Sequence, residues 1–219
     1  DTTLGMSIST YTGTGANATV GHGLGVAPKM MFIKNIGVTD PWAVYYNDNT
    51  DYLVLNTTAA TVDDSTMWND TTPTSSVFSI GSNHQVNASS ENYVAYCFAP
   101  SQFISIGSFE GNANADGPFM PTLNSSGIPL QPIWTLQKSV DAVKAWWTLD
   151  AARSPYNIMQ KYLLPDQATA EGAFVIEDFV TGGVKLRTAN SNLNIASTHI
   201  YMVVGTPMID TDGRIIAGK

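Results

Sequence analysis

The chain has 219 residues, 43% of them hydrophobic and only 13% charged, which is enough apolar material for a packed core and too little charge for a disordered chain. The formal net charge of −8 repels phosphate backbones and argues against a nucleic-acid partner. No apolar run is long enough to span a bilayer, and no basic amphipathic stretch indicates membrane insertion. Residues 1–4 contain no secretory signal and no initiator Met, so we expect a fragment of a longer protein.

Short predicted strands recur in the same order in the two halves of the chain, which indicates an internal duplication. The matched segments are 7–13 with 105–111, 28–34 with 132–138, Trp42 with Trp146, 52–53 with 162–163, 78–80 with 184–186, and 94–96 with 200–202. The offset is 98 for the first pair, 104 for the next two, 110 for the fourth and 106 for the last two. We therefore predict two repeats, 5–99 and 103–205, joined near residues 100–102 and followed by a tail, 206–219.

The matched segments alternate between apolar and polar residues with a period of two, as half-buried strands do. Clusters of Gly, Pro, Asn, Asp, Ser and Thr separate them and favour turns. The fold predicted is all-β, with two tandem antiparallel β-sandwich repeats of jelly-roll-like type and a C-terminal β-hairpin. Only residues 154–164 could hold a short helix, because Pro155 fits a first turn and Pro165 ends it.

The same alternation predicts which side chains form the core. Cys97 is the single cysteine, and its apolar surroundings predict a small buried hydrophobic residue. The predicted core comprises Met30, Phe32, Trp42, Phe78, Ile80, Val94, Tyr96, Phe98, Trp134, Leu136, Trp146, Val184, Leu186, Ile200 and Met202.

Nucleotide and metal sites are disfavoured by the context of the motifs that resemble them. The segment 21–25, Gly-His-Gly-Leu-Gly, is followed by Pro28 and a strand, so no helix N-terminus is available to hold phosphate. The three histidines are scattered, which predicts polar residues of loops or sheet surfaces. The segment 210–213, Asp-Thr-Asp-Gly, resembles part of a calcium loop but predicts a hairpin turn more simply. We expect no metal and no cofactor.

Catalytic carboxylates are also disfavoured. Glycosidases need two carboxylates roughly 5–10 Å apart across the sugar. The pairs Asp63-Asp64 and Glu177-Asp178 are neighbours in predicted strands and should point to opposite faces. A pair formed between two chains stays open, so a glycan hydrolase is the third alternative, and we expect no enzyme.

A family resemblance comes from strings in both repeats. They are residues 19–29 (TVGHGLGVAPK) and 93–98 (YVAYCF) in the first copy, and 152–157 (ARSPYN) and 185–188 (KLRT) in the second. The chain resembles duplicated domains of tail-fibre-like, receptor-binding proteins of marine and cyanobacterial phages. The resemblance implies a virion component in a tail fibre that contacts a host surface, and it transfers no catalytic residue.

Large side chains absent from one copy are the candidate ligand contacts. Trp147 matches Ala43, and Trp68 lies in a polar segment with no Trp in the second copy. An exposed aromatic side chain beside polar groups suits stacking on a sugar. Asp70 and Tyr46 are further candidates. The alternatives are that Trp147 fills a junction between copies or subunits, and that Trp68 anchors its own loop.

Two classes of function follow. The first is non-enzymatic adhesion to a host glycan or protein receptor; the second is a structural fibre or decoration module that binds only other phage tail proteins. The tail carries Met208, Ile209, Ile215 and Ile216, which an isolated hairpin cannot bury. We therefore predict a homotrimer with these four residues at a subunit contact. The alternatives are that the tail covers the open end of the second sandwich or is disordered.

Overall fold

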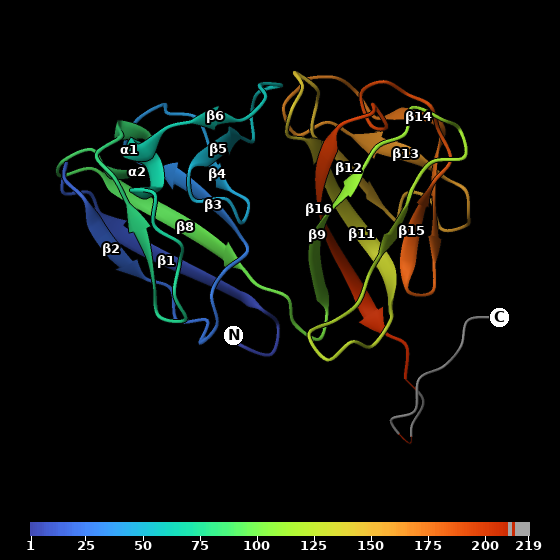
Figure 1. Ribbon diagram of the computed structural model, residues 1–219, viewed down its shortest axis with the longest axis horizontal. Coiled ribbons are helices and arrows are strands. Elements are labelled where there is room, and N and C mark those ends of the chain that lie inside the picture. Colours follow the sequence, from blue (N-terminus) through green and yellow to red (C-terminus); the bar gives the residue numbers. More distant parts are fainter. Residues whose placement is uncertain (210–211, 213–219) are drawn as a thin grey trace. The chain divides into compact units, whose positions relative to one another are not determined.

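The computed structural model describes residues 1–209 and residue 212. The chain divides into two compact units with the boundary between Ala99 and Pro100, coloured blue to green and green to red in Figure 1. We call them repeat 1 and repeat 2. Nearly all regular structure in both is antiparallel strand, so the predicted all-β fold is confirmed.

Repeat 1 is built from a large and a small antiparallel sheet. The six-stranded sheet has the order β1-β8-β3-β4-β5-β6, and β2 pairs with β7 in a separate sheet. Its elements are β1 (Met6–Thr12), β2 (Ala18–Gly21), β3 (Met30–Asn35), β4 (Ala43–Tyr45), β5 (Asp51–Val54), β6 (Val62–Asp63), α1 (Ser65–Trp68), β7 (Val77–Ile80), α2 (His84–Asn87) and β8 (Asn92–Phe98). The two short helices begin at Asp64 and Asn83, whose side chains accept backbone hydrogen bonds from the first turn.

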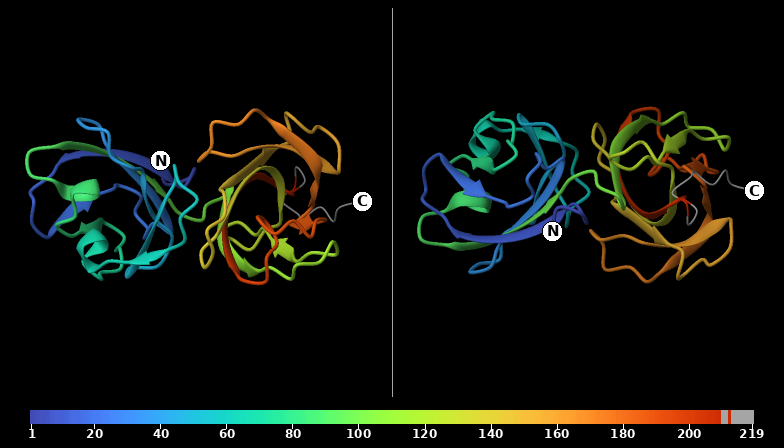
Figure 2. Two further views of the ribbon diagram at one scale, coloured as in Figure 1. Left: turned by 90° about the horizontal axis from the view of Figure 1, so that it is seen from above. Right: turned by 90° about the horizontal axis from the view of Figure 1, so that it is seen from below.

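Repeat 2 consists of one eight-stranded sheet, which is strongly curved and nearly closes into a barrel in Figure 2. The order is β10-β15-β14-β13-β12-β11-β16-β9. The strands are β9 (Ile104–Glu110), β10 (Phe119–Pro121), β11 (Leu130–Ser139), β12 (Trp147–Asp150), β13 (Met159–Leu163), β14 (Gly172–Val180), β15 (Gly183–Leu186) and β16 (Thr198–Pro207). A tight turn at Thr181-Gly182 joins β14 to β15, and Gly182 supplies the positive φ of 78° there.

The ladders of the two repeats follow the offsets predicted from the sequence. Phe32 on β3 lies opposite Tyr96 on β8, and Leu136 on β11 lies opposite Met202 on β16. The remaining equivalent pairs are Ile8↔Tyr96 with Ile106↔Met202, Val44↔Leu53 with Thr148↔Leu163, and Val20↔Phe78 with Met120↔Val184. A shift of one residue would reverse every side chain of a strand, so this agreement is strong support for the duplication.

The predicted core was partly wrong about which strand face points inward. Phe78, Ile80, Val184 and Leu186 do lie in the core clusters. The core of repeat 1, however, includes Met31, Ile33, Tyr93, Ala95 and Cys97, whereas Met30, Phe32, Val94, Tyr96 and Phe98 point to the other face of the same sheet. Met30 to Ile33 are all buried, so hydrophobicity alone could not distinguish the two faces.

The same reversal occurs in repeat 2. Thr135 and Gln137 point inward, where Glu177 binds them, and Trp134 and Leu136 lie outside the core cluster. Ile200, Met202 and Trp146 are buried but also lie outside it. Trp42 is half-buried and packs against Tyr96 with ring centroids 6.1 Å apart. Polar inward residues on β11 therefore misled the assignment of the strand face.

The prediction that only residues 154–164 could hold a short helix is wrong, because the short helices are α1 and α2 of repeat 1. Residues 159–163 form β13, in which Met159 is buried and Gln160 and Lys161 are exposed. Hydrogen bonds from the side chain of Asn157 to the backbone of Phe179 hold the preceding segment against β14, in competition with helical hydrogen bonds.

The predicted tail begins inside a strand, because β16 continues to Pro207. The Met208 amide donates to the Pro129 carbonyl at 2.9 Å, and Ile209 is exposed. Ile215 and Ile216 lie outside the described residues, so the hairpin and its subunit contact stay predictions. No helix within residues 1–209 has the length and hydropathy needed to cross a bilayer.

Candidate functional site

Two of the aromatic candidates in repeat 1 converge on one aspartate. Trp68 is 1% exposed, and its indole Nε1 donates to the Asp51 carbonyl at 3.0 Å. The hydroxyl of half-buried Tyr46 donates to Asp51 Oδ2 at 3.4 Å. Asp70 is exposed and follows α1 in a left-handed conformation, with φ of 44°. The prediction of an exposed, ligand-binding Trp68 is therefore wrong, and the alternative, that Trp68 anchors its own loop, is confirmed.

The prediction that Trp147 is an exposed ligand contact is also wrong. The side chain is 3% exposed and belongs to the core cluster of repeat 2, with its ring centroid 4.4 Å from that of Tyr162. Trp147 and Leu149 occupy the inward face of β12, whereas Trp146 precedes the strand. The large ring that replaces Ala43 of repeat 1 thus fills the interior of the repeat.

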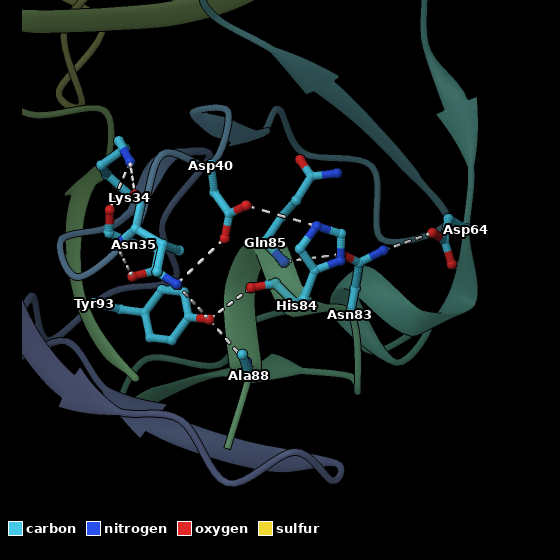
Figure 3. A network of polar contacts seen from close by, with 10 residues as sticks. Lys34, Asn35, Asp40, Asp64, Asn83, His84, Gln85, Ala88 and Tyr93 are labelled. Atoms are coloured by element: carbon cyan, nitrogen blue, oxygen red, sulfur yellow. Dashed lines mark hydrogen bonds and ion pairs between the residues drawn. The ribbon is translucent and has the colours of Figure 1, made fainter. Parts of the chain in front are cut away.

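A polar network in repeat 1 connects β3, α2 and β8 (Figure 3). The Tyr93 hydroxyl donates to the His84 carbonyl at 2.6 Å and accepts from Ala88 N at 2.8 Å and Asn35 Nδ2 at 3.2 Å. Asn35 Nδ2 also donates to Asp40 at 3.3 Å, and Asp40 lies 3.7 Å from His84 Nε2. Burial raises the pKa of the Tyr93 hydroxyl. These partners tie the short helix to the sheet, which is a structural role.

The acidic pair of repeat 2 separates to opposite faces of β14, as predicted. Glu177 is fully buried and accepts from Thr135 Oγ1 at 3.1 Å and Gln137 Nε2 at 2.6 Å. Desolvation raises the pKa of this carboxyl to about 7. Asp178 instead pairs with Arg187 at 2.7 Å. The two carboxylates share no site across which a sugar would fit.

His22 and His199 are buried rather than at a surface as predicted, and their rings contact backbone groups. The His22 ring accepts from Leu24 N at 3.2 Å through Nδ1 and lies 3.1 Å from the Thr74 carbonyl through Nε2. His199 lies 2.9 Å from the Ser197 carbonyl and stacks on Phe109. Across residues 1–209, no group of three or more His, Cys, Asp or Glu side chains is placed to hold a metal ion.

The connection between β12 and β13, residues 151–158, is clamped to the sheet along its length; we call it the tyrosine loop. Asp150 Oδ1 accepts from Arg153 N at 2.8 Å, and Ser154 Oγ accepts from Gln160 N and Lys161 N at 3.2 and 3.1 Å. The Asn157 side chain donates to the Phe179 carbonyl at 2.8 Å and accepts from its amide at 3.0 Å. These clamps hold the backbone on both sides of Pro155-Tyr156.

Tyr156 in this loop is 84% exposed, the highest exposure among the large hydrophobic side chains of the described chain. Tyr156 lines two hollows of about 300 Å³ each, together with Ser154, Pro155 and Asn157. One extends over Gln131, Ile133 and Phe179, and the other over Arg153, Gln160 and Lys161. The loop thus presents an exposed aromatic side chain that lines two depressions together with hydrogen-bonding side chains.

The tyrosine loop was missed although the sequence contains a signal for it. The offset between the copies rises from 104 at Trp42 and Trp146 to 110 at Tyr52 and Tyr162, so the second copy has extra residues between them. Insertions in one copy of a repeat lie in loops, which often form the binding face. The extra residues contain Tyr156.

Comparison with known proteins gives a family. A family described as a domain of unknown function, DUF7483, matches residues 1–206. No curated protein and no solved structure matches the chain. The match extends over both repeats, so the duplicated unit as a whole is what the family shares. The chain belongs to the DUF7483 family.

Proposed function

We propose that the chain is a non-enzymatic receptor-binding domain of a phage tail fibre, and that it attaches to glycans of the host surface through the tyrosine loop. The observation that carries the proposal is the 84% exposure of Tyr156 on a backbone held by Asp150, Ser154 and Asn157. The resemblance of residues 152–157 to phage fibre sequences supports it.

A fixed aromatic ring suits carbohydrate recognition for two physical reasons. The apolar face of a pyranose packs against the face of a tyrosine, while side-chain amides can bind the hydroxyl groups around it. Gln131 and Asn157 line the hollow on one side, and Gln160 lines the other. Because the loop is already ordered, a ligand loses little free energy to loop ordering on binding.

Binding without cleavage is favoured over hydrolysis by the positions of the carboxylates. Glu177 is enclosed by Thr135 and Gln137, and Asp178 is paired with Arg187. Asp64 caps helix α1 by accepting from Thr66 N at 2.8 Å. Each of these carboxylates has a structural partner within its own repeat.

The test is binding of the full chain to an array of bacterial surface polysaccharides. We expect a subset to be bound, with Tyr156→Ala lowering binding at least tenfold and Tyr156→Phe, which keeps the ring, retaining most of it. Val143→Ala is the matched control, because Val143 is 69% exposed in the same repeat and outside both hollows. Folding is checked by circular dichroism, where all three variants should melt as the parent does.

An array without bound glycans would overturn the proposal in favour of a structural module that binds only other phage proteins. Retained binding in Tyr156→Ala would place the glycan site elsewhere and also overturn it. The homotrimer is proposed separately. Light scattering of the full chain and of a chain ending at Ile209, which keeps all of β16, tests whether the last residues hold a trimer together.

A further inference from the structure

The two hollows beside Tyr156 differ in charge. The hollow over β13 is lined by Arg153 and Lys161 and by no Asp or Glu, whereas the hollow over Gln131 and Phe179 has no charged lining residue. The chain as a whole has a formal net charge of −8 and only 10 Lys and Arg residues. Two of these few cations thus line one depression of about 300 Å³.

Carboxylates outside this hollow hold both cations. Lys161 Nζ lies 3.0 Å from Glu171 Oε1, and Arg153 Nε lies 3.5 Å from Glu171 Oε2. Arg153 Nη1 also lies 3.3 Å from Asp150 Oδ2. Neither Glu171 nor Asp150 lines the hollow. The acids thus hold two side chains that also line the hollow.

Both cations have donors beyond these ion pairs. An ammonium group has three N–H donors and a guanidinium has five, arranged in a fork that matches a carboxylate. The side chain of Lys161 is 51% exposed, and that of Arg153 is 34% exposed. A ligand anion that enters the hollow can therefore bind both groups without breaking the pairs with Glu171 and Asp150.

The corresponding connection in repeat 1 has the opposite character. Residues 46–50 join β4 to β5, contain Asp48, and include no Lys or Arg. The Asp48 carboxylate accepts from Thr50 N at 3.0 Å and Asp51 N at 3.3 Å, which closes this shorter loop on itself. The cationic hollow thus belongs to the insertion that distinguishes the second copy, together with Tyr156.

We propose that the tyrosine loop selects acidic glycans, with the sugar ring on Tyr156 and the carboxylate of a uronic or related acid at Arg153 and Lys161. The inference rests on the proposed glycan-binding function and deepens it. Charge-assisted hydrogen bonds to the carboxylate supply the selectivity, and contact with the Tyr156 ring supplies affinity that does not depend on charge. Neutral polysaccharides of the same backbone then bind more weakly.

The experiment uses the full chain and an array of bacterial polysaccharides printed in native form and after chemical reduction of their carboxyl groups, with sulfated dextran as a further probe. Bound acidic polysaccharides should lose at least tenfold in affinity on carboxyl reduction, and their binding should weaken between 50 and 500 mM NaCl. Lys161→Gln should lower affinity for the native form at least fivefold and lower affinity for the reduced form by a much smaller factor. Lys29→Gln is the matched control, since Lys29 is an exposed lysine that donates to Asn47 in the corresponding loop of repeat 1.

The outcomes distinguish selection of acidic glycans from glycan binding itself. If Tyr156→Ala abolishes binding while carboxyl reduction and Lys161→Gln have no effect, the loop binds glycans but does not select acidic ones, and the inference is overturned alone. If only sulfated dextran is bound, the anion is not a carboxylate and the inference is likewise overturned. If nothing on the array is bound, or Tyr156→Ala binds as the parent does, the proposed function itself fails.

Discussion

The two repeats share one strand order but fill their interiors with different chemistry. On the third strand of repeat 1, Met31 and Ile33 point into an apolar cluster. The residues at the same register in repeat 2 are Thr135 and Gln137, which bind the buried carboxyl of Glu177. The difference teaches that pairing register, rather than a particular set of core side chains, is what the duplicated fold requires.

What the copies share inside is a pair of buried asparagines. Asn87 donates to the carbonyls of Ala16 and Gly81 at 2.6 and 2.7 Å and accepts from Thr14 N at 2.7 Å. Asn194 donates to the carbonyls of Asn114 and Thr188, both at 2.8 Å. Each side chain fastens the loop that follows the first strand of its repeat to the segment before the last strand. Both repeats therefore attach this loop through a buried asparagine, although their core side chains differ.

The largest effect should come from the residue that differs most in volume between the copies. Trp147→Ala removes the main ring from the core of repeat 2, and Ala43 occupies the same register in repeat 1. We expect a loss of about 3–5 kcal/mol in the free energy of unfolding, the usual range for a large buried aromatic side chain. Trp42→Ala should cost much less, because Trp42 is half-buried and lies outside the core cluster. Equal losses in urea unfolding would contradict this assignment of the cores.

The polar interior of repeat 2 should make its stability depend on pH. Burial raises the pKa of Glu177 from 4.5 to about 7, so the folded state binds the proton more tightly than the unfolded state. The stability from this group is complete below pH 4.5 and is lost as pH rises to about 7, by about 3 kcal/mol. Glu177→Gln should remove this part of the pH dependence in urea unfolding at pH 4.5 to 8. Glu110→Gln, at an exposed position on β9, should leave the dependence as it is in the parent.

Sequence periodicity predicted the repeats and their registers better than the site, for physical reasons. Alternation identifies strands, but a strand such as 30–33, buried on both faces, does not show which face points inward. The inward face of β11 was assigned wrongly because Thr135 and Gln137 are polar and bind a buried partner, Glu177, about 40 residues away. No local sequence pattern connects these residues. The aromatic candidates were wrong because a large side chain that is found in only one repeat can fill the core of that repeat as readily as it can be exposed for binding. Tyr156 was indicated only by the change of offset between the copies.

The buried asparagines should matter equally in both repeats. Asn87→Ala leaves Thr14 N and the carbonyl of Gly81 without this partner, and Asn194→Ala does the same to the carbonyls of Asn114 and Thr188. We expect each variant to lose about 2 kcal/mol, the cost of leaving buried polar groups unsatisfied. Calorimetry of the full chain should show that each substitution lowers the melting transition of its own repeat. A destabilised transition in one variant and not in the other would break the equivalence of the two asparagines.

The smallest effects should come from the two tyrosines that stand in the corresponding loops between the fourth and fifth strands. Tyr46 is half-buried and donates to Asp51, so Tyr46→Ala removes packing and a hydrogen bond, and should cost about 1 kcal/mol. Tyr156 is 84% exposed, and the clamps of its loop come from Asp150, Ser154 and Asn157 rather than from its own side chain. Tyr156→Ala should therefore change the free energy of unfolding by less than about 0.5 kcal/mol, as surface substitutions do. Urea unfolding of the two variants side by side measures the difference. A Tyr156→Ala variant as unstable as Tyr46→Ala would mean that the ring packs on the protein, which would leave the tyrosine loop no free aromatic face with which to bind a ligand.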